Sequence, residues 1–416
     1  MVVAHIASTL TGGAGIGMQR YHEAMLVAGL DSRIVVGSGS ASADSRIARC
    51  HRQPASLVRR VARRVGIQLD PAARRLSEVE ELDAAAGGHA GYELFSPPFS
   101  DCIPEEHPWV KQADVLNLHW VAGTVDWPRF FRKVSKPVII TLHDQQPYLG
   151  GFHYARDLDN NPHLQRVEAH ARGVKQAALA GHRVTVVGNS EWNTREAQAS
   201  GFFPTGTRYH TLYYPLDTQV YAPWPKQAAR AALGLPPART VIGFASEDLG
   251  NRRKGFDVLL EALQRLPASL TTQCCILSFG REPAQELKDR VPMPGLHLGH
   301  LDSDAVKVAA YSAMDLFVAP SLAEAFGLTA IEALACGTPA IASRTGGLAE
   351  ALFGGDGGVL VEPGNPTALV EALISSLEHS ERRATLAGAG RRLLVERHAP
   401  ARVGQHWLEI CRASLA

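Results

Sequence analysis

The chain has 416 residues, of which 45% are hydrophobic and 20% charged, a composition typical of a folded globular protein long enough for two or three domains. Its formal net charge of +1 argues for neither a nucleic-acid nor a membrane partner, so we expect no nucleic acid, and no apolar run reaches the ~20 residues that a membrane-spanning helix needs. The six cysteines show no metal-finger spacing, so we expect free thiols in a reducing, cytoplasmic compartment. The N-terminus has no basic region before its short apolar run, which predicts a first strand instead of a signal peptide.

Short apolar runs alternate with longer helix-like stretches along the chain. In the first half the expected strands are Val2–Ser8, Arg33–Gly37, Val115–Trp120, Val138–His143 and Val184–Gly188. In the second half they are Val241–Ala245, Cys274–Phe279, Leu316–Pro320, Pro339–Ala342 and Val359–Val361. Strands that alternate with helices predict βαβ units and parallel sheets, whose strands are buried on both faces and therefore continuously apolar.

A proline-rich stretch between Tyr214 and Pro237 separates the two halves and contains no long strand. We therefore predict an α/β protein of two Rossmann-like domains, residues 1–215 and 216–399, facing each other across a cleft. The last helix, 400–416, could pack on the second domain or return to the first.

The segment 46–75 differs from the alternation of strands and helices in the rest of the chain. It holds nine arginines and one acid, Asp70. Four apolar residues recur there at helical spacing: Leu57, Val58, Val61 and Val65. Four arginines fall on the opposite side of such a helix: Arg59, Arg60, Arg63 and Arg64. A basic amphipathic helix can lie on an anionic membrane surface. The alternative is a solvated helix whose apolar stripe packs on the domain, and both interpretations stay open.

The most specific pattern is the string over 320–339, which follows the expected strand Leu316–Pro320. Gly327 interrupts the string, and Leu328–Cys336 is predicted to be a helix. The carboxyl edge of a parallel sheet, followed by a helix N-terminus, is where a diphosphate binds, because first-turn amides and the helix dipole favour an anion. The expected amide donors span Phe326, Gly327, Leu328 and Thr329.

Two glutamates stand in this string. Glu332 on the second helical turn is placed to accept hydrogen bonds from vicinal hydroxyls such as those of a ribose, and Glu324 in the loop lies where a sugar ring would be. Either glutamate alone would more often cap or decorate a helix. The complete string favours ligand binding.

The basic residues Arg252, Arg253 and Lys254 open a helix after the first strand of the second half. A basic cluster at a helix N-terminus opposes the dipole, so we favour a functional role over a solvated helix start. Lys254 would place a point charge on a diphosphate, and one of the two arginines would add a bidentate fork. The glycine loop at Gly12–Gly17 would let a ligand approach the backbone, but Met18 breaks the dinucleotide fingerprint GxGxxG.

The string over 320–339 resembles the Glu-x7-Glu motif of retaining glycosyltransferases of family 4, which have the two-domain GT-B fold. Three further matches follow in the expected order: Thr11–Gly15, Arg252–Phe256 and Ser343–Gly347. Three segments of the first half are similar to the branch that assembles bacterial exopolysaccharides and related surface glycans: Asn117–Trp120, Thr141–Asp144 and Gly150–Tyr154.

The resemblance implies transfer of a hexose, with retention, from a nucleoside-diphosphate sugar to a hydroxyl of a glycan, lipid-linked or small-molecule acceptor. The second domain would bind the donor and the first domain the acceptor. The catalytic candidates are His143, Lys254 and Glu324. The donor-binding candidates are Gly13, Arg252, Arg253, Lys254, Glu324, Phe326, Gly327, Leu328, Thr329 and Glu332. The acceptor-side candidates are Gly12, Gly13, His119, His143 and Asp144, where Asp144 would orient His143 or contact the acceptor.

We expect no cofactor and no metal ion, because helix amides and Lys254 would supply the positive charge. Two DxD strings, Asp157–Asp159 and Asp302–Asp304, are weak three-letter matches that we interpret as surface turns or caps. No side chain stands out as a covalent nucleophile, and the resemblance implies that the leaving phosphate helps to take the acceptor proton.

Two other classes of function remain open. A sugar-nucleotide epimerase of the same fold would need no acceptor, and an inactive relative would only bind glycans. The expected location is cytoplasmic, with peripheral contact to the inner membrane face if 46–75 binds anionic lipid.

Overall fold

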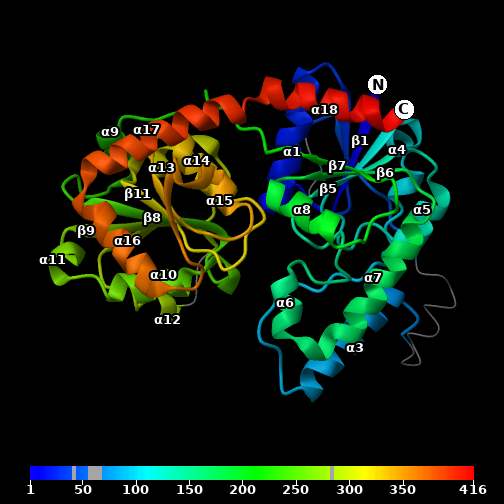
Figure 1. Ribbon diagram of the computed structural model, residues 1–416, viewed down its shortest axis with the longest axis horizontal. Coiled ribbons are helices and arrows are strands. Elements are labelled where there is room, and N and C mark those ends of the chain that lie inside the picture. The colour runs from blue at the N-terminus through cyan, green and yellow to red at the C-terminus, as the bar shows by residue number, and fades with distance from the viewer. Residues whose placement is uncertain (40–43, 55–67, 282–284) are drawn as a thin grey trace. The chain divides into compact units, whose positions relative to one another are not determined.

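The computed structural model describes the whole chain except residues 40–43, 55–67 and 282–284 (Figure 1). The amphipathic helix expected within 46–75 thus falls largely outside the described residues. The chain divides into two compact units, Met1–Tyr213 with Pro400–Ala416, and Tyr214–Ala399. Among the helices of the described part, none has the length and apolar character required to cross a bilayer.

The first unit is built on a seven-stranded parallel sheet in the order β3-β2-β1-β4-β5-β6-β7. Its strands are β1 Val2–Ala7, β2 Asp31–Val36, β3 Ile47–Arg49, β4 Val115–Leu118, β5 Val138–Leu142, β6 Val184–Gly188 and β7 Arg208–Thr211. Its helices are α1 Gly12–Val27, α3 Pro71–Ala85, α4 Pro108–Gln112, α5 Trp127–Lys133, α6 Ala155–Asn160, α7 Gln165–Leu179, α8 Glu191–Ala199 and α18 Pro400–Leu415.

The second unit contains a six-stranded parallel sheet in the order β10-β9-β8-β11-β12-β13. Its strands are β8 Thr240–Asp248, β9 Cys274–Arg281, β10 Gly295–His297, β11 Leu316–Ala319, β12 Ala340–Ser343 and β13 Gly358–Val361. Its helices are α9 Lys226–Leu233, α10 Phe256–Gln264, α11 Ala268–Thr271, α12 Gln285–Lys288, α13 Asp304–Ala313, α14 Leu328–Ala335, α15 Leu348–Ala351, α16 Pro366–Glu378 and α17 Ser380–Arg397.

Two Rossmann-like parallel sheets confirm the predicted fold class, and each of the ten expected strands is present with its ends shifted by a few residues at most. Three strands were not predicted: β3, β7 and β10. β3 and β10 have three residues each, β7 has four, and all three close an edge of a sheet. Edge strands are only partly covered, so their sequences lack a continuous apolar run.

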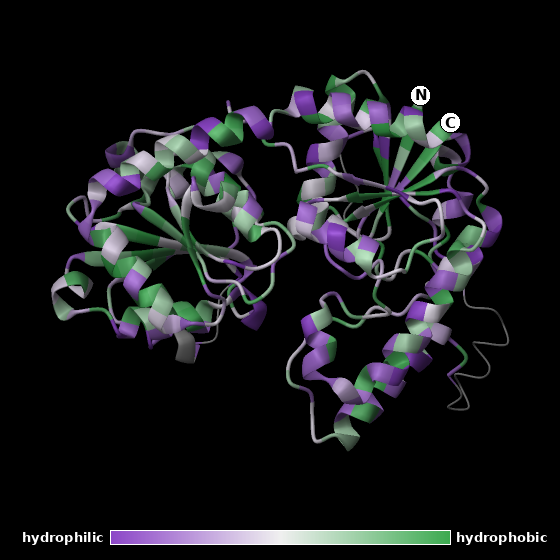
Figure 2. Cartoon of the chain, viewed as in Figure 1, coloured by the Kyte–Doolittle hydropathy of each residue, from purple (hydrophilic) through white to green (hydrophobic). Residues whose placement is uncertain are grey.

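Helices cover both faces of each sheet, and the hydropathy colouring shows apolar strands inside and polar helix faces outside (Figures 1 and 2). The core of the first unit includes Leu116, Ile140 and Val186 of neighbouring strands. The core of the second unit includes Ile242 and Val318. Burial on both faces explains why these strands are apolar throughout.

Helix α18 packs on α1 and thus belongs to the first unit, which decides between the two alternatives left open by the sequence. The indole of Trp407 meets the ring of Tyr21 edge-on, with centroids 5.2 Å apart. Gly404 allows the two helices to approach, because a Cβ there would lie 2.2 Å from the carbonyl oxygen of Ala24.

Both sheets reverse their strand order at one point, between β1 and β4 in the first unit and between β8 and β11 in the second. At such a switch point the connections leave to opposite sides, and a crevice opens at the carboxyl ends of the strands. The loops after β1, β4, β8 and β11 are therefore the places to look for a site.

Candidate functional site

In the second unit, the basic segment after β8 meets the glutamate loop after β11. Lys254 lies at the end of a 3-10 turn, Arg252–Lys254, and its Nζ is 2.6 Å from Oε2 of Glu324. A guanidinium nitrogen of Arg253 is 3.7 Å from the same oxygen and donates a hydrogen bond of 3.0 Å to the carbonyl of Ala323. Two cations and one carboxylate thus share the switch point of this sheet.

The backbone brings these loops together. The amide of Leu322 donates to the carbonyl of Arg253 at 2.7 Å. Gly255 has a positive φ of 72°, and a Cβ there would lie 2.1 Å from the carbonyl oxygen of Pro320. Only glycine therefore allows the turn that follows Lys254 to pass so close to the start of the 320–339 string.

Glu324 keeps its negative charge although its side chain is largely enclosed. Burial alone would raise the pKa of this carboxyl, but the charges of Lys254 and Arg253 outweigh it, and hydrogen bonds from Lys254 and the Phe326 amide add to their effect. The net result is a pKa below the ordinary value for glutamate. The carboxylate can therefore accept hydrogen bonds from the hydroxyls of a ligand.

Helix α14 begins next to this cluster with Gly327 as its N-cap, and no side chain caps its first turn. Gly327 has a φ of 108°, and a Cβ there would lie 2.4 Å from a methyl carbon of Leu348. The amide of Gly347 donates to the carbonyl of Glu324 at 3.1 Å, which places the predicted Ser343–Gly347 match against the same loop. The uncapped first turn of α14 is suited to an anion.

Glu332 has a different hydrogen-bond partner from Glu324. It lies on α14, is 6% exposed, and its Oε2 accepts a hydrogen bond of 2.9 Å from the hydroxyl of Tyr311 on α13. Burial, and then the neighbouring Glu332 carboxylate, raises the pKa of the Tyr311 phenol well above its usual range, so the phenol remains a donor. Tyr311 holds the carboxylate in place, and no pattern in the sequence had indicated it.

The predicted donor-side residues separate into two sets. Arg253, Lys254 and Glu324 contact one another, whereas the side chain of Arg252 is exposed, so Arg253 is the arginine placed beside Lys254. The other predicted donor residues of the second unit follow along the loop and α14: Phe326, Gly327, Leu328, Thr329 and Glu332.

In the first unit, the predicted glycine loop is wrong in its conformation. Helix α1 begins at Gly12, so the glycines form its first turns, and only Gly12 among Gly12–Gly17 has a positive φ, 72°. Gly15 packs closely on the preceding chain, because a Cβ there would lie 2.3 Å from the carbonyl carbon of Leu10. Gly12 and Gly13 therefore offer helix amides at the carboxyl end of β1.

His143 follows β5 directly and is 8% exposed. Its Nε2 is 2.8 Å from Nδ1 of His119, which follows β4. Burial lowers the pKa of His143 to about 4, although the charge of Asp144 opposes this shift. The imidazole is therefore neutral at physiological pH.

The carboxylate of Asp144, next in sequence to His143, has three hydrogen-bond partners. Its Oδ2 is 2.6 Å from Nδ1 of His153 and accepts a hydrogen bond of 2.9 Å from Nε1 of Trp120, and its Oδ1 accepts one of 2.9 Å from the amide of Gln146. The ring of His143 contacts His119. His153 is thus one of the partners of Asp144.

The DxD strings show no arrangement for a metal ion. Asp157 lies in α6, and Asp304 opens α13. In the described part of the chain, no group of three or more His, Cys, Asp and Glu residues is placed to hold a metal. The six cysteines are buried free thiols, as the sequence predicted.

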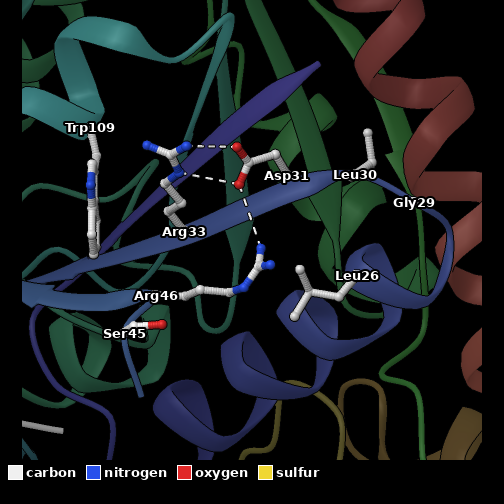
Figure 3. Close-up of a pocket in the computed structure, with 8 residues that line it drawn as sticks. All are labelled: Leu26, Gly29, Leu30, Asp31, Arg33, Ser45, Arg46 and Trp109. Carbon is white, nitrogen blue, oxygen red and sulfur yellow. Dashed lines mark hydrogen bonds and ion pairs between the residues drawn. The ribbon is translucent and has the colours of Figure 1, made fainter. Parts of the chain in front are cut away.

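A pocket of about 650 Å³ in the first unit lies at the other end of its sheet, where β2 begins (Figure 3). Asp31 there forms ion pairs with Arg33 at 2.7 Å and Arg46 at 3.5 Å, and the guanidinium of Arg33 lies 5.8 Å from the ring centroid of Trp109. None of the predicted site residues lines this pocket. It is therefore separate from the carboxyl edge that carries His143.

The chain is similar to known sugar-transferring proteins in sequence. Residues 239–379 match the family described as glycosyl transferases group 1. The chain is 35% identical over 284 residues to a D-inositol 3-phosphate glycosyltransferase of Xylanimonas cellulosilytica, covering 67% of each. It is 36% identical over 196 residues to a D-inositol 3-phosphate glycosyltransferase 1 of Catenulispora acidiphila, covering 44% of this chain and 46% of that protein. The aligned part spans about half to two thirds of the length of the curated relatives.

Solved structures share the two-domain fold at low sequence identity. Sucrose-phosphate synthase of Thermosynechococcus elongatus has a TM-score of 0.70 at 20% identity, with 99% of this chain and 98% of that chain covered. The Anabaena HepE protein, in complex with UDP and glucose, has a TM-score of 0.71 at 17% identity, with 99% and 100% covered. The predicted GT-B fold is confirmed by these neighbours.

Proposed function

Because the chain belongs to the group 1 glycosyl transferases, we propose that it transfers a hexose from a nucleoside-diphosphate sugar to an acceptor hydroxyl, with retention at the anomeric carbon. The observation that carries the proposal is the contact of Lys254 and Arg253 with Glu324 beside the uncapped start of α14. These groups offer positive charge for a diphosphate and a carboxylate for sugar hydroxyls.

The two ends of a donor would be bound by different groups of this site. The amides of the first turn of α14 and the ammonium of Lys254 would hold the diphosphate, which gains charge as the sugar leaves. Glu332, held by Tyr311, would accept the ribose hydroxyls, and Glu324 the hydroxyls of the sugar. Preorganised charge of this kind replaces a metal ion, so we propose that the reaction needs none.

In the first unit, Gly12, Gly13, His119, His143 and Asp144 would form the acceptor side. In the proposed reaction the bond from the anomeric carbon to the phosphate oxygen breaks, and the acceptor oxygen attacks on the same face. The acceptor proton passes to the departing phosphate.

The acceptor class follows from the relatives. Two of them are named D-inositol 3-phosphate glycosyltransferases, so a phosphorylated polyol is the first acceptor to test. The exopolysaccharide branch suggested by segments such as Gly150–Tyr154 makes a glycan or lipid-linked sugar the second candidate.

The experiment begins with thermal melting in UDP-, GDP-, TDP- and ADP-glucose, because a ligand that binds only the native state raises the melting temperature. The donor that gives the largest shift is incubated with inositol 3-phosphate or a glycan acceptor, in EDTA and in Mg²⁺, and the anomeric configuration of the product is read by NMR. We expect retention and equal rates with EDTA and Mg²⁺. An epimerised sugar nucleotide without acceptor would show an epimerase, and no shift with any donor would show an inactive relative.

A further inference from the structure

One face of helix α7 contacts the loop that follows β5 in the first unit, residues 144–153. Three charged residues of the helix, Glu168, Arg172 and Lys175, are spaced so that they lie on the same face. Each of them forms hydrogen bonds with the backbone of this loop. The helix therefore holds the loop through its main chain, whatever side chains the loop carries.

The carboxylate of Glu168 accepts hydrogen bonds from three consecutive amides of the loop. Its Oε1 accepts from the amide of Gly150, and its Oε2 accepts from the amides of Gly151 at 2.6 Å and Phe152 at 3.2 Å. Glu168 is 3% exposed. Burying a charge is costly unless it is paired or hydrogen-bonded, so this position of the glutamate depends on the loop being in place.

Two consecutive glycines let the loop lie this close to the helix. A Cβ at Gly150 would lie 2.0 Å from the carbonyl oxygen of Glu168, and a Cβ at Gly151 would lie 2.4 Å from the ring of Phe95. A side chain at either position would push the loop away from its partners. The contact with α7 thus gives a physical reason for the glycine pair that opens the segment Gly150–Tyr154.

The two cations of the same face bind the carbonyl groups of the loop. Nζ of Lys175 donates to the carbonyl of Gln146 at 2.7 Å and to that of Leu149 at 3.1 Å, and Lys175 is 0% exposed. Nε of Arg172 donates to the carbonyl of Tyr148 at 3.2 Å. Because α7 binds both amides and carbonyls, the loop is fixed along most of its length.

The fixed loop determines where the carboxylate of Asp144 lies. The amide of Gln145 donates to the carbonyl of His153 at 3.1 Å, which joins the two ends of the loop. Nδ1 of His153 and the indole N–H of Trp120 bind Oδ2 of Asp144. Burial would raise the pKa of Asp144, but His153 and the amide of Gln146 outweigh it and keep the pKa below its ordinary value. The ionised carboxylate can accept hydrogen bonds from hydroxyls.

We propose that Glu168 and Lys175 are positioning residues for the acceptor, because they fix the loop 144–153 and with it the carboxylate that meets an acceptor hydroxyl. The inference rests on the proposed function, which assigns Asp144 to the acceptor side. A loop that is ordered before binding loses little conformational entropy when the acceptor arrives. The effect concerns the acceptor and not the donor, since Lys254 and Glu332 belong to the second unit.

Amide hydrogen exchange in the full chain tests the contact without any substrate. We expect the amides of residues 150–152 to be protected in the wild type, because a buried carboxylate binds them. Glu168→Gln leaves one acceptor oxygen for three amides, and exchange there should become about tenfold faster or more, as for the loss of a hydrogen bond to a charged group.

The matched control is Glu105→Gln in the same unit. Glu105 is also buried, but its carboxylate pairs with Arg129 of α5 at 2.6 Å. Both substitutions should lower the melting temperature, since each removes a buried charge from its partners. Only Glu168→Gln should speed the exchange of residues 150–152.

Kinetics then separate positioning from stability. The probes are UDP-glucose as donor and inositol 3-phosphate as acceptor, or the glycan acceptor if the wild type uses only that one. We expect Glu168→Gln to raise the KM for the acceptor about tenfold or more above that of Glu105→Gln. The KM for UDP-glucose and the calorimetric affinity for UDP should stay nearly unchanged. Lys175→Met, which acts on the carbonyl groups of the loop, should give the same result and replaces Glu168→Gln if that variant does not fold.

The two halves of the inference fail separately. If residues 150–152 of the wild type exchange at the rate of free peptide amides, α7 does not hold the loop. If Glu168→Gln frees the loop but leaves the acceptor KM equal to that of Glu105→Gln, the loop does not position the acceptor. If the wild type transfers sugar from no donor to any acceptor, the proposed function is wrong and the acceptor role falls with it, while the exchange rates still decide the contact with α7.

Discussion

At the scale of single residues, the contact between Lys254 and Glu324 combines binding with stability. Lys254 is the cation closest to Glu324, at 2.6 Å, and the side chains are 23% and 13% exposed. We expect Lys254→Met to lower kcat by about 10²–10³, the typical effect of removing one preorganised group that faces developing charge. Steady-state kinetics with the donor identified by melting would measure it.

Two controls separate catalysis from folding in this prediction. The exposed lysine Lys111 pairs with Glu106 at 2.8 Å, and Lys111→Met should change neither rate nor melting temperature appreciably, because exposed ion pairs contribute little. Lys254→Met combined with Glu324→Gln also removes the carboxylate that has lost its nearest cation, and should restore part of the stability but no activity. A wild-type rate in Lys254→Met would place the diphosphate elsewhere.

Glu332 should act on binding more than on chemistry. A hydrogen bond to a charged group contributes about 1.5–3 kcal/mol, so Glu332→Ala should weaken nucleotide affinity roughly ten- to hundredfold. Tyr311→Phe leaves the carboxylate in place without its 2.9 Å hydrogen bond, and we expect a smaller loss of affinity. Calorimetric titration with UDP and UDP-glucose would measure both, and unchanged affinity in a folded Glu332→Ala would refute the ribose role.

At the scale of elements, the packing of α18 against α1 depends on one glycine. A Cβ at Gly404 would lie 2.2 Å from the backbone oxygen of Ala24, so Gly404→Ala must push the helices apart. We expect a loss of about 1–3 kcal/mol in the free energy of unfolding, as for other overpacked sites. Urea denaturation followed by circular dichroism would measure it.

Gly173 on α7 is the matched control, because a Cβ there would meet nothing within 4 Å. Gly173→Ala should stabilise the protein by about 0.5–1 kcal/mol, since alanine is the better helix former. Equal effects of the two substitutions would mean that α18 does not pack on α1 as described.

At the scale of the whole molecule, the neutral histidines make folding sensitive to acid. The folded pKa values of His5, His119 and His143 lie below the ordinary value of 6.5, for His143 at about 4. Between the folded and the unfolded pKa the unfolded chain binds more protons, so stability is lost as the pH falls below about 6.5. Each site contributes up to about 1.4 kcal/mol per pH unit.

The measurement compares urea midpoints at pH 7.5, 6.5 and 5.5. His119→Asn should reduce the loss between pH 6.5 and 5.5, whereas His170→Gln, at an exposed position of α7, should leave it unchanged. Asp144 acts in a lower window, because its depressed pKa stabilises the fold above about its ordinary value of 3.8 and that contribution is lost below it. If the stability does not change between pH 7.5 and 5.5, the histidines His5, His119 and His143 are not buried in their neutral form.

The sequence by itself determined the two parallel sheets and the donor-side loop. Strands buried on both faces must be continuously apolar, and this local property located β1, β5 and β11 before any contact was known. The string over 320–339 likewise specified the turn at Gly327 and helix α14, because helix starts and stops are encoded within a few residues.

Only the tertiary structure decided which side chains act together. His5 and His119 are 114 positions apart and meet because β1 and β4 are neighbours at the switch point of the sheet. The partners of Asp144 and Glu332 depend in the same way on how the loops and helices pack. Local periodicity reports which residues are buried, but strand order and packing choose their neighbours, and hydrogen-bond partners are a property of those neighbours.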